Sequence, residues 1–510
     1  MKNITLFILL FLLSSVGYSQ HNIVPHPSKV DFFQDSPFVL GRDVVIISDT
    51  EFLTEANIIA SLIFDRFNIR VRVGQKSLED YSVISIKKID DNTKEGYQLS
   101  VKENECIILA SGGAGALYGG ITLSQMIEFD KERKNLIIKS ARIEDQPRFA
   151  WRGLMLDCSR TFLPVDYLKR TIDRMAFYKL NVLHLHLTDD QGWRLEIKKR
   201  LNLTSEGAFF SQSAIEPEEF EGYYTQDEIR ELIIYAAHRH IQIVPEIEVP
   251  GHSGAAIHAY PELSCTKEKV PIYPLIHHGA KKPNDVFCAG NEGTYSFFED
   301  VLSEVTSLFP SPYVHLGGDE VSKHHWENCE ICQKKMADLK IKNEDFLQRY
   351  VMDRVGKNVT KANKRPIGWD EIMEGDISRD WIIMGWRDES KGREALQKGY
   401  EVVMTPTSHL YFDYSYATTP TKKVYAYNPI PADITEEQKS RILGIQANFW
   451  THIDRWPSRI DFQLYPRTLA LSERAWSDPS VNDYENFHQR GKNHKKWLQF
   501  FKIEYNDNEL

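Results

Sequence analysis

Two adjacent carboxylates, Asp319 and Glu320, follow a short apolar run and two glycines. The run 313–316 has the apolar character of a strand that is covered on both faces. Gly317 and Gly318 allow the backbone to turn sharply and to approach a ligand closely. Parallel α/β folds carry their reactive side chains at the carboxyl ends of such strands. We therefore expect acid–base chemistry at Asp319 and Glu320, although adjacent Asp and Glu residues also occur on ordinary solvated loops.

Other apolar runs of the chain are also followed by side chains that suit chemistry. Carboxylates, one Arg, two His, one Tyr and three Trp stand at these positions. They are Asp157, Arg160, Asp189, Glu246, His252, Trp369, Trp386, Tyr411, Asp413, Trp450 and His452. A scatter of ordinary surface residues would not place Trp repeatedly at the same topological position.

Two kinds of hydrolysis suit this set of side chains. In glycoside hydrolysis, carboxylates transfer protons and Trp faces hold the sugar. In metal-dependent hydrolysis, His184 and His186 would share one face of a strand. His252, His315 and Asp319 could join them to bind zinc. Both strand histidines precede the strand end, however, which favours buried, hydrogen-bonded roles. A third alternative is a non-catalytic sugar-binding protein, although binding alone needs few ionised groups.

The elements that would position these residues alternate between apolar runs and helical segments. The runs after Trp151 cover residues 153–156, 182–187, 241–249, 313–316, 366–369, 381–386, 401–405 and 443–450. Eight strands with mostly helical connections favour a (β/α)8 TIM barrel, which is an α/β fold.

The connections between these runs are uneven. Helices are predicted at 164–178 and 292–309, and a capping box at Thr225 predicts the start of another. The interval 370–380 is too short for a full helix, so the barrel should be irregular there. A last helix at 462–476 would close it.

Residues 21–147 are predicted to form a small α+β domain before the barrel. Strands are expected at 44–47 and 106–109, and helices at 55–67 and 115–129. The predicted division is a signal peptide at 1–20, this domain at 21–147, a catalytic barrel at 148–478 and a C-terminal tail at 479–510.

The composition and the N-terminal sequence limit which partners and which cellular compartment are expected. The 510 residues carry a net charge of −10, so nucleic acid is an unexpected partner. A basic start, an apolar run at 4–13 and small residues after it are typical of a signal peptide. The run is too short to span a bilayer, and no later segment suggests a membrane span. We expect export to the periplasm or the extracellular space.

Export permits disulfides. The six cysteines are Cys106, Cys158, Cys265, Cys288, Cys329 and Cys332. Cys265 and Cys288 flank one polar loop and are the predicted disulfide pair. Cys329 and Cys332 form a lone CxxC without a second pair at zinc spacing, so zinc is not expected and their pairing stays open. The other two lie in apolar runs and are predicted to be buried free thiols.

The motifs around these residues resemble glycoside hydrolase family 20, the β-N-acetylhexosaminidases. The matching segments occur in family order at 152–160, 184–194, 245–252, 315–320, 368–371 and 444–450. The unit 21–147 resembles the small domain that often precedes this barrel. Several long motifs coincide, which makes the resemblance specific.

The resemblance implies a retaining, substrate-assisted mechanism. The 2-acetamido oxygen of the sugar attacks C1 and forms an oxazolinium ion. Glu320 would be the general acid and then the general base. Asp319 would orient the acetamido N–H and balance the developing positive charge.

The resemblance also assigns substrate-binding roles. Tyr411 would donate to the acetamido oxygen, and Trp369, Trp386 and Trp450 would wall its pocket. Arg160 would hold the 3- and 4-hydroxyls through its fork of donors.

Further roles lie at the edge of this site. Asp189 and His252 would support Asp319 and Glu320, and Asp413 would contact the outer hydroxyls. The implied partner is a glycan with a terminal non-reducing N-acetylhexosamine, cleaved in exo fashion by a monomer or homodimer. No metal or organic cofactor is implied.

The chain departs from the family pattern at His452. The family usually has Glu two residues after the strand-eight Trp450, where it binds the 4- and 6-hydroxyls. Without that carboxylate, a 6-sulfate would meet less repulsion, and a protonated His452 or the nearby Arg455 could attract it. In the alternative interpretation, His452 hydrogen-bonds a plain hydroxyl, or another loop supplies the acceptor.

Overall fold

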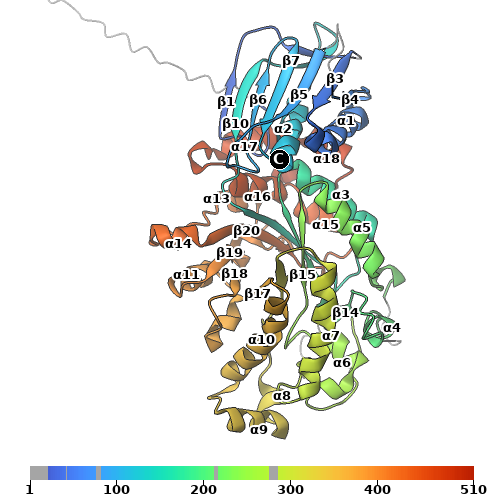
Figure 1. The fold of residues 1–510 in the computed structure, drawn as a ribbon, viewed down its shortest axis with the longest axis vertical. Helices are drawn as coiled ribbons and strands as arrows, with labels where there is room; N and C mark the ends of the chain where they lie inside the picture. Colours follow the sequence, from blue (N-terminus) through green and yellow to red (C-terminus); the bar gives the residue numbers. More distant parts are fainter. Residues whose placement is uncertain (1–20, 42, 76–81, 212–215, 275–284) are drawn as a thin grey trace, which may run out of the picture.

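The computed structural model describes residues 21–41, 43–75, 82–211, 216–274 and 285–510. An N-terminal unit built on a twisted sheet lies at one end of the molecule, and a barrel with its surrounding helices forms the rest (Figure 1). The predicted signal peptide, residues 1–20, lies outside the described residues.

Eight parallel strands close into a barrel in chain order, which confirms the predicted (β/α)8 fold. They are β11 (Trp151–Asp157), β12 (Val182–His186), β15 (Gln242–Glu246), β16 (Tyr313–His315), β17 (Arg365–Trp369), β18 (Ile382–Gly385), β19 (Glu401–Met404) and β20 (Ile442–Phe449). The barrel closes where β20 pairs with β11, with Trp151 opposite Gly444. Almost every residue of these strands is buried, as expected for a parallel sheet that is covered on both faces.

Helices cover the outside of the barrel. The longer ones are α3 (Val165–Phe177), α5 (Gln226–Ala237), α7 (Glu292–Leu308), α10 (Glu344–Lys361), α11 (Glu389–Gln397), α15 (Pro457–Leu464) and α16 (Arg467–Trp476). The predicted capping box is present at Thr225, whose side chain accepts from the backbone N–H of Glu228 while Glu228 reaches back. Only a 3₁₀ helix (Asp370–Gly375) fills the short interval before β18, as its length predicted.

Short elements shape the loops of the barrel. They are β13 (Thr188–Asp189), β14 (Gly192–Trp193), α4 (Asn202–Ser205), α6 (Gly254–Ala259), α8 (His324–Glu327), α9 (Glu330–Leu339), α12 (Thr407–Leu410), α13 (Thr421–Ala426) and α14 (Glu436–Ser440). The last three occupy the long polar interval before β20, where no single long helix covers the barrel.

Two helix predictions need correction. The single last helix predicted at 462–476 is two helices, α15 and α16, because Pro466 lacks the N–H that a continuous helix requires and its ring clashes with the preceding turn. The helix predicted at 115–129 is α2 (Gly113–Gln125), and Phe129 lies instead in strand β8 (Glu128–Asp130).

The N-terminal unit holds a seven-stranded mixed sheet in the order β1-β10-β6-β7-β5-β3-β4. These strands are β1 (Lys29–Phe32), β3 (Val44–Ser48), β4 (Arg72–Gly74), β5 (Ser82–Lys88), β6 (Tyr97–Val101), β7 (Glu105–Ala110) and β10 (Ala141–Asp145). Helices α1 (Leu53–Phe67) and α2 pack against it, and a small second sheet joins β2 (Phe38–Leu40), β9 (Asn135–Ile138) and β8.

The C-terminal tail, whose fold the sequence left open, packs at the junction of the two parts. Its helices are α17 (Tyr484–Asn493) and α18 (Lys495–Phe500). Trp497 contacts Phe67 of α1 with ring centroids 5.9 Å apart. Arg490 pairs with Glu473 of the barrel at 2.6 Å and donates to the carbonyl oxygen of Ile23 at 2.8 Å. The tail therefore ties the barrel to the N-terminal unit.

The predicted disulfide between Cys265 and Cys288 is wrong, because all six cysteines are free thiols. The chain returns after β16 and brings Cys329 and Cys332 against this loop, so four thiols share the space that the prediction gave to two. Cys106 and Cys158 are buried and free, as predicted.

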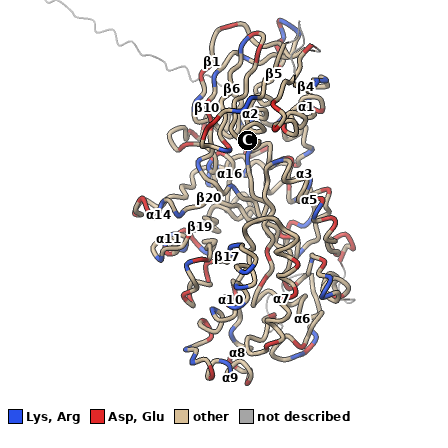
Figure 2. The backbone as a smooth tube through the Cα atoms, viewed as in Figure 1, with Lys and Arg blue, Asp and Glu red and all other residues tan. Residues whose placement is uncertain are grey.

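Acidic and basic residues are interspersed over both parts of the described backbone (Figure 2). This mixture agrees with the absence of a basic excess in the sequence. Within the described residues, no helix combines the length and the apolar character needed to cross a bilayer.

Candidate active site

The backbone turns sharply after β16, at the two glycines of the predicted site. Gly317, Gly318 and Glu320 have φ angles of 62°, 93° and 48°. A Cβ at Gly317 would lie 1.7 Å from Oε2 of Glu248, so only glycine fits there. Glu320 is a non-glycine residue in the left-handed region, a strained conformation that clusters at functional sites.

This turn separates the two carboxylates by environment. The side chain of Asp319 is 11% exposed, whereas that of Glu320 is 56% exposed. Nε2 of His252 lies 3.6 Å from Oδ2 of Asp319 and 3.6 Å from Oε2 of Glu320. One carboxylate is thus held inside the protein and the other is open to solvent.

Ion pairs connect these carboxylates to Arg160. Nη2 of Arg160 lies 2.7 Å from Asp189, and Nδ1 of His252 lies 3.3 Å from the other oxygen of Asp189. Burial alone would raise the pKa of Asp189, but the charges of Arg160 and His252 hold it well below its usual range. Burial would likewise lower the pKa of His252, yet Asp189 and Asp319 raise it well above its usual value. We call Arg160, Asp189, His252, Asp319 and Glu320 the charged half of the rim.

The strand histidines lie behind this half, around the carboxylate of Glu246. His184 and His186 are fully buried, as predicted. Nε2 of His184 lies 3.1 Å from Glu246, and Nδ1 of His186 is hydrogen-bonded to it. His315 lies 2.8 Å from Glu246 through its Nδ1. The five residues considered for zinc therefore fall into separate groups, since His252 lies beside Asp189 and Asp319 instead.

Aromatic rings form the other side of the rim. The ring of Trp386 stacks on Tyr411 at 6.0 Å, and Tyr411 lies 6.3 Å from Trp450. Trp369 lies 6.1 Å from Trp450, is fully buried, and donates from Nε1 to Glu246 at 2.8 Å. We call Trp369, Trp386, Tyr411 and Trp450 the aromatic half. It meets the charged half where the guanidinium of Arg160 lies 4.8 Å from the Trp450 ring.

Asp413 follows Tyr411 and is buried. Burial raises the pKa of Asp413 to about 7 and that of Tyr411 well above its usual range. Oδ1 of Asp413 is buried and has no hydrogen-bond partner among the described residues.

His452, where the chain departs from the family pattern, is partly buried, and the nearby Arg455 already forms an ion pair. His452 lies just after β20. Arg455, three residues after His452, pairs with Glu216 at 2.5 Å and donates from Nε to Thr161 at 2.9 Å. Its charge is therefore neutralised within the protein.

Two site carboxyls, Glu248 and Glu371, were not singled out from the sequence. Oε2 of Glu371 accepts from Nε1 of Trp386 at 2.8 Å, and burial together with the charge of Asp319 raises the pKa of Glu371 to about 8. Within the part of the chain that the structure describes, both carboxyl oxygens of Glu248 are buried without a hydrogen-bond partner, and burial and the charge of Asp319 raise its pKa as well. The available signal was their place in the strand-end motifs, beside Glu246 and Trp369.

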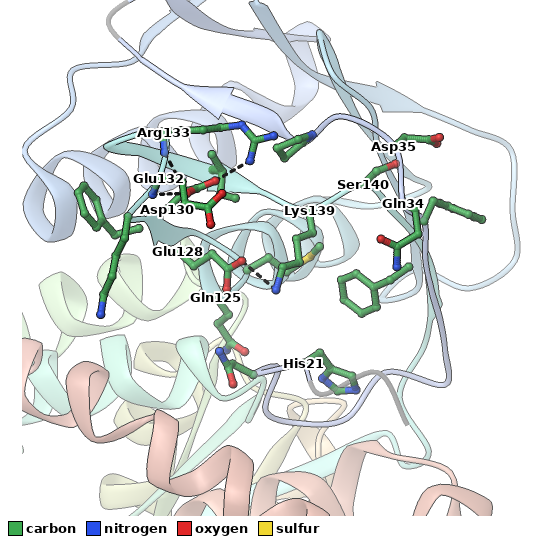
Figure 3. A pocket seen from close by; sticks show the side chains of 18 residues that line it. His21, Gln34, Asp35, Gln125, Glu128, Asp130, Glu132, Arg133, Lys139 and Ser140 are labelled. Atoms are coloured by element: carbon green, nitrogen blue, oxygen red, sulfur yellow. Dashed lines mark hydrogen bonds and ion pairs between the residues drawn. The ribbon is translucent and has the colours of Figure 1, made fainter. Parts of the chain in front are cut away.

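A hollow of about 830 Å³ lies elsewhere, in the N-terminal unit (Figure 3). Two ion pairs line it, Lys139 with Glu128 at 2.9 Å and Arg133 with Asp130 at 2.6 Å. All the residues that line the hollow belong to the N-terminal unit, so none of the predicted strand-end residues lies in it.

Comparison with known proteins agrees with this geometry. The model of the glycosyl hydrolase family 20 catalytic domain matches residues 149–479, and that of domain 2 of the same family matches residues 20–146. A β-hexosaminidase of Porphyromonas gingivalis is 36% identical over 504 residues, covering 95% of this chain and 64% of its own length. One from Vibrio furnissii is 37% identical over 398 residues, covering 74% of this chain and 64% of its own length.

A solved structure extends the likeness to three dimensions. The exo-β-N-acetylglucosaminidase of Vibrio harveyi, in complex with N-acetylglucosamine, superposes with a TM-score of 0.85 at 30% identity, covering 96% of this chain and 78% of that one. This chain spans 64% of the length of both curated relatives named above. The match of both domains, in sequence and in fold, shows that this chain belongs to glycosyl hydrolase family 20.

Proposed function

We propose that this protein is an exo-acting, retaining β-N-acetylhexosaminidase that uses the acetamido group of its substrate as the nucleophile. The observation that carries the proposal is the pairing of a buried Asp319 with an exposed Glu320 beside an aromatic wall. The curated relatives, which are named β-hexosaminidases, support it.

The first chemical step would use three groups. Glu320 donates its proton to the glycosidic oxygen, which leaves with the aglycone as that bond breaks. The acetamido carbonyl oxygen forms a new bond to C1 and gives the oxazolinium ion. Asp319 accepts a hydrogen bond from the acetamido N–H and stabilises the positive charge that spreads over it. In the second step, the ionised Glu320 takes a proton from water as the water oxygen attacks C1, which restores the acetamide and retains the configuration.

Binding would follow the two halves of the rim. The partly exposed Trp386 and Trp450 would line the acetamido pocket, while the fully buried Trp369 would support Trp450 from behind. Tyr411 would donate to the acetamido oxygen. Arg160 would hold the 3- and 4-hydroxyls, which leaves no room for further sugars and makes the action exo.

The substrate would be a glycan that ends in β-linked N-acetylglucosamine or N-acetylgalactosamine. Export to the periplasm or beyond, proposed from residues 1–20, would place the enzyme with such glycans.

The first test compares two nitrophenyl sugars. The β-N-acetylglucosaminide should release nitrophenol, whereas the matching β-glucoside, which lacks the acetamido nucleophile, should release almost none. Glu320→Gln should lose most of the activity. Equal cleavage of both sugars, or full activity in the variant, would contradict the proposal. Cleavage of neither sugar would favour the binding-only alternative, and loss of activity with a chelator would favour the metal-dependent one.

The finer proposal is a preference for 6-sulfated N-acetylglucosamine at the His452 position. Because Arg455 is already paired with Glu216, the attraction would rest on a protonated His452 and on the missing carboxylate. Hydrolysis of plain and 6-sulfated nitrophenyl N-acetylglucosaminides, for the wild type and His452→Glu, tests it. Only the wild type should hydrolyse the sulfated sugar faster than the plain one. The same ratio of the two rates in both proteins would contradict the proposal.

A further inference from the structure

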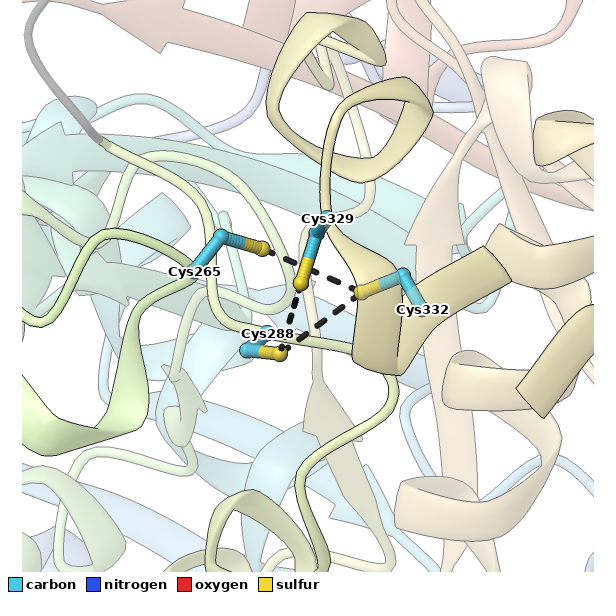
Figure 4. Close-up of side chains that lie close together, drawn as sticks. All are labelled: Cys265, Cys288, Cys329 and Cys332. Atoms are coloured by element: carbon cyan, nitrogen blue, oxygen red, sulfur yellow. Dashed lines mark hydrogen bonds between the residues drawn. The ribbon is translucent and has the colours of Figure 1, made fainter. Parts of the chain in front are cut away.

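Four cysteines from two distant loops meet at one point outside the candidate active site. Their sulfur atoms point toward one another (Figure 4). The Sγ atom of Cys332 lies 3.8 Å from that of Cys265 and 3.6 Å from that of Cys288, and the Sγ atoms of Cys288 and Cys329 are 3.8 Å apart. All four Sγ atoms lie within 4.8 Å of one another.

These separations match the edges of a metal–thiolate tetrahedron. A zinc–sulfur bond of about 2.3 Å in tetrahedral geometry places sulfur atoms about 3.8 Å apart. A disulfide requires about 2.05 Å. The sulfur atoms of the cluster are therefore spaced as ligands of one ion rather than as two covalent pairs.

The surrounding protein is built closely around the sulfur atoms. Cys288, Cys329 and Cys332 are 1%, 8% and 0% exposed. The backbone N–H of Gly290 points at Sγ of Cys332 from 3.4 Å, a contact that stabilises a thiolate. A Cβ at Gly290 would lie 2.4 Å from the carbonyl oxygen of Ile331, so the close approach of the two loops requires glycine.

We propose that Cys265, Cys288, Cys329 and Cys332 bind one Zn²⁺ ion as a structural tetrathiolate site. Four protein ligands fill the tetrahedron and leave no open position for water, which is the mark of a structural rather than a catalytic zinc. The site does not show a recognisable zinc spacing in the sequence. Its CxxC, Cys329 and Cys332, is joined by two single cysteines, Cys265 and Cys288, which stand 64 and 41 positions before Cys329.

The ion would join the two barrel loops that carry His252, Asp319 and Glu320 of the charged half. Cys265 and Cys288 belong to the connection between β15 and α7, which also holds His252. Cys329 and Cys332 belong to the connection between β16 and α10, which also holds Asp319 and Glu320. Trp326 reinforces the junction by donating from Nε1 to the carbonyl oxygen of Phe287 at 2.9 Å. Zinc would thus fix the distance between His252 and the two carboxylates through their loops.

Metal content tests the site without reference to catalysis. The full chain is expressed with added zinc, purified without chelators, and analysed for metal by mass spectrometry together with a count of reactive thiols after denaturation. We expect about one zinc per chain and six free thiols once the metal is removed. The matched variants are Cys332→Ser in the cluster and Cys106→Ser, a buried thiol of the N-terminal unit; only the first should lose the zinc.

A second measurement protects the test against misfolding of Cys332→Ser. The wild-type chain reconstituted with Co²⁺ should show thiolate-to-cobalt charge-transfer bands and the d–d bands of a tetrahedral site. Metal-free protein with two disulfides, between any of the four cysteines, would overturn the proposal. So would metal-free protein with six free thiols, or zinc retained equally by Cys332→Ser.

Discussion

The charged half of the rim and the aromatic half are held in place by different forces. The chain Arg160–Asp189–His252–Asp319 is positioned by ion pairs of 2.7 to 3.6 Å. The aromatic rings are positioned by packing, at centroid distances of 6.0 to 6.3 Å, and by indole N–H donors to Glu246 and Glu371. Loss of one charge therefore leaves a buried partner uncompensated, whereas a smaller ring leaves a cavity into which its neighbours relax only in part.

The two halves therefore have different roles in the proposed reaction. The charged half supplies groups that change protonation or meet charge as the reaction proceeds. The aromatic half supplies shape and surface that bind the sugar before and after the reaction. Changes in the charged half should therefore lower kcat, and changes in the aromatic half should raise KM.

The largest effect is expected from Glu320→Gln. Loss of the general acid should lower kcat for the nitrophenyl β-N-acetylglucosaminide by about 10²–10⁴-fold. A 2,4-dinitrophenyl leaving group needs little protonation. With that substrate, the rate of the first chemical step should therefore fall far less in the variant. An equal decrease in rate for both leaving groups would show that Glu320 is not the general acid.

The next largest effect is expected from Asp319→Asn. The variant keeps the shape but removes the negative charge opposite the oxazolinium ion, and kcat should fall by about 10²–10³-fold. KM for the same substrate should change little, since Trp386 and Trp450 are untouched. A loss confined to KM would place Asp319 in ground-state binding instead.

A smaller effect is expected in the aromatic half, from Trp450→Phe. The smaller ring weakens contact with the sugar and with the Arg160 guanidinium, which costs about 1–2 kcal/mol, or about 5–30-fold in kcat/KM. Most of the change should be in KM. A kcat loss as large as that of Asp319→Asn would erase the proposed distinction between the two halves.

The smallest effect concerns Glu371, which accepts a hydrogen bond from Trp386 of the aromatic half and whose pKa is raised by the charge of Asp319 in the charged half. Burial and the charge of Asp319 raise the pKa of Glu371 to about 8 from its usual 4.5. Between pH 4.5 and about pH 8, the Glu371 carboxyl is therefore protonated in the folded protein and ionised in the unfolded chain. Its contribution to stability therefore falls as pH rises from about 4.5 to about 8 and is level above that. Urea unfolding midpoints at pH 5 and pH 8 should differ less in Glu371→Gln than in the wild type. A difference that stays unchanged or grows would contradict this assignment.

The sequence predicts those parts of the molecule whose signals are local. The eight barrel strands, the capping box at Thr225 and the left-handed turn at Gly317 all follow from patterns within a few residues. The break at Pro466 was also local, but the apolar pattern on either side outweighed it.

Features made by distant segments were harder to predict. Arg455 is neutralised by Glu216, which stands 239 positions away, and the four-cysteine cluster joins loops around α7. The raised pKa of Glu371 depends on Asp319 from a neighbouring strand end. In each case the sequence supplies the residue types, and the closed barrel decides which of them meet.

The central claim is that the rim aligns the acetamido group of the substrate as the nucleophile. Its most direct test is kcat/KM for nitrophenyl glycosides whose N-acetyl group carries zero, one, two or three fluorine atoms. Fluorine withdraws electrons from the carbonyl oxygen, so the rate should fall steeply with each added atom. Rates that do not change along the series would show that another nucleophile attacks C1.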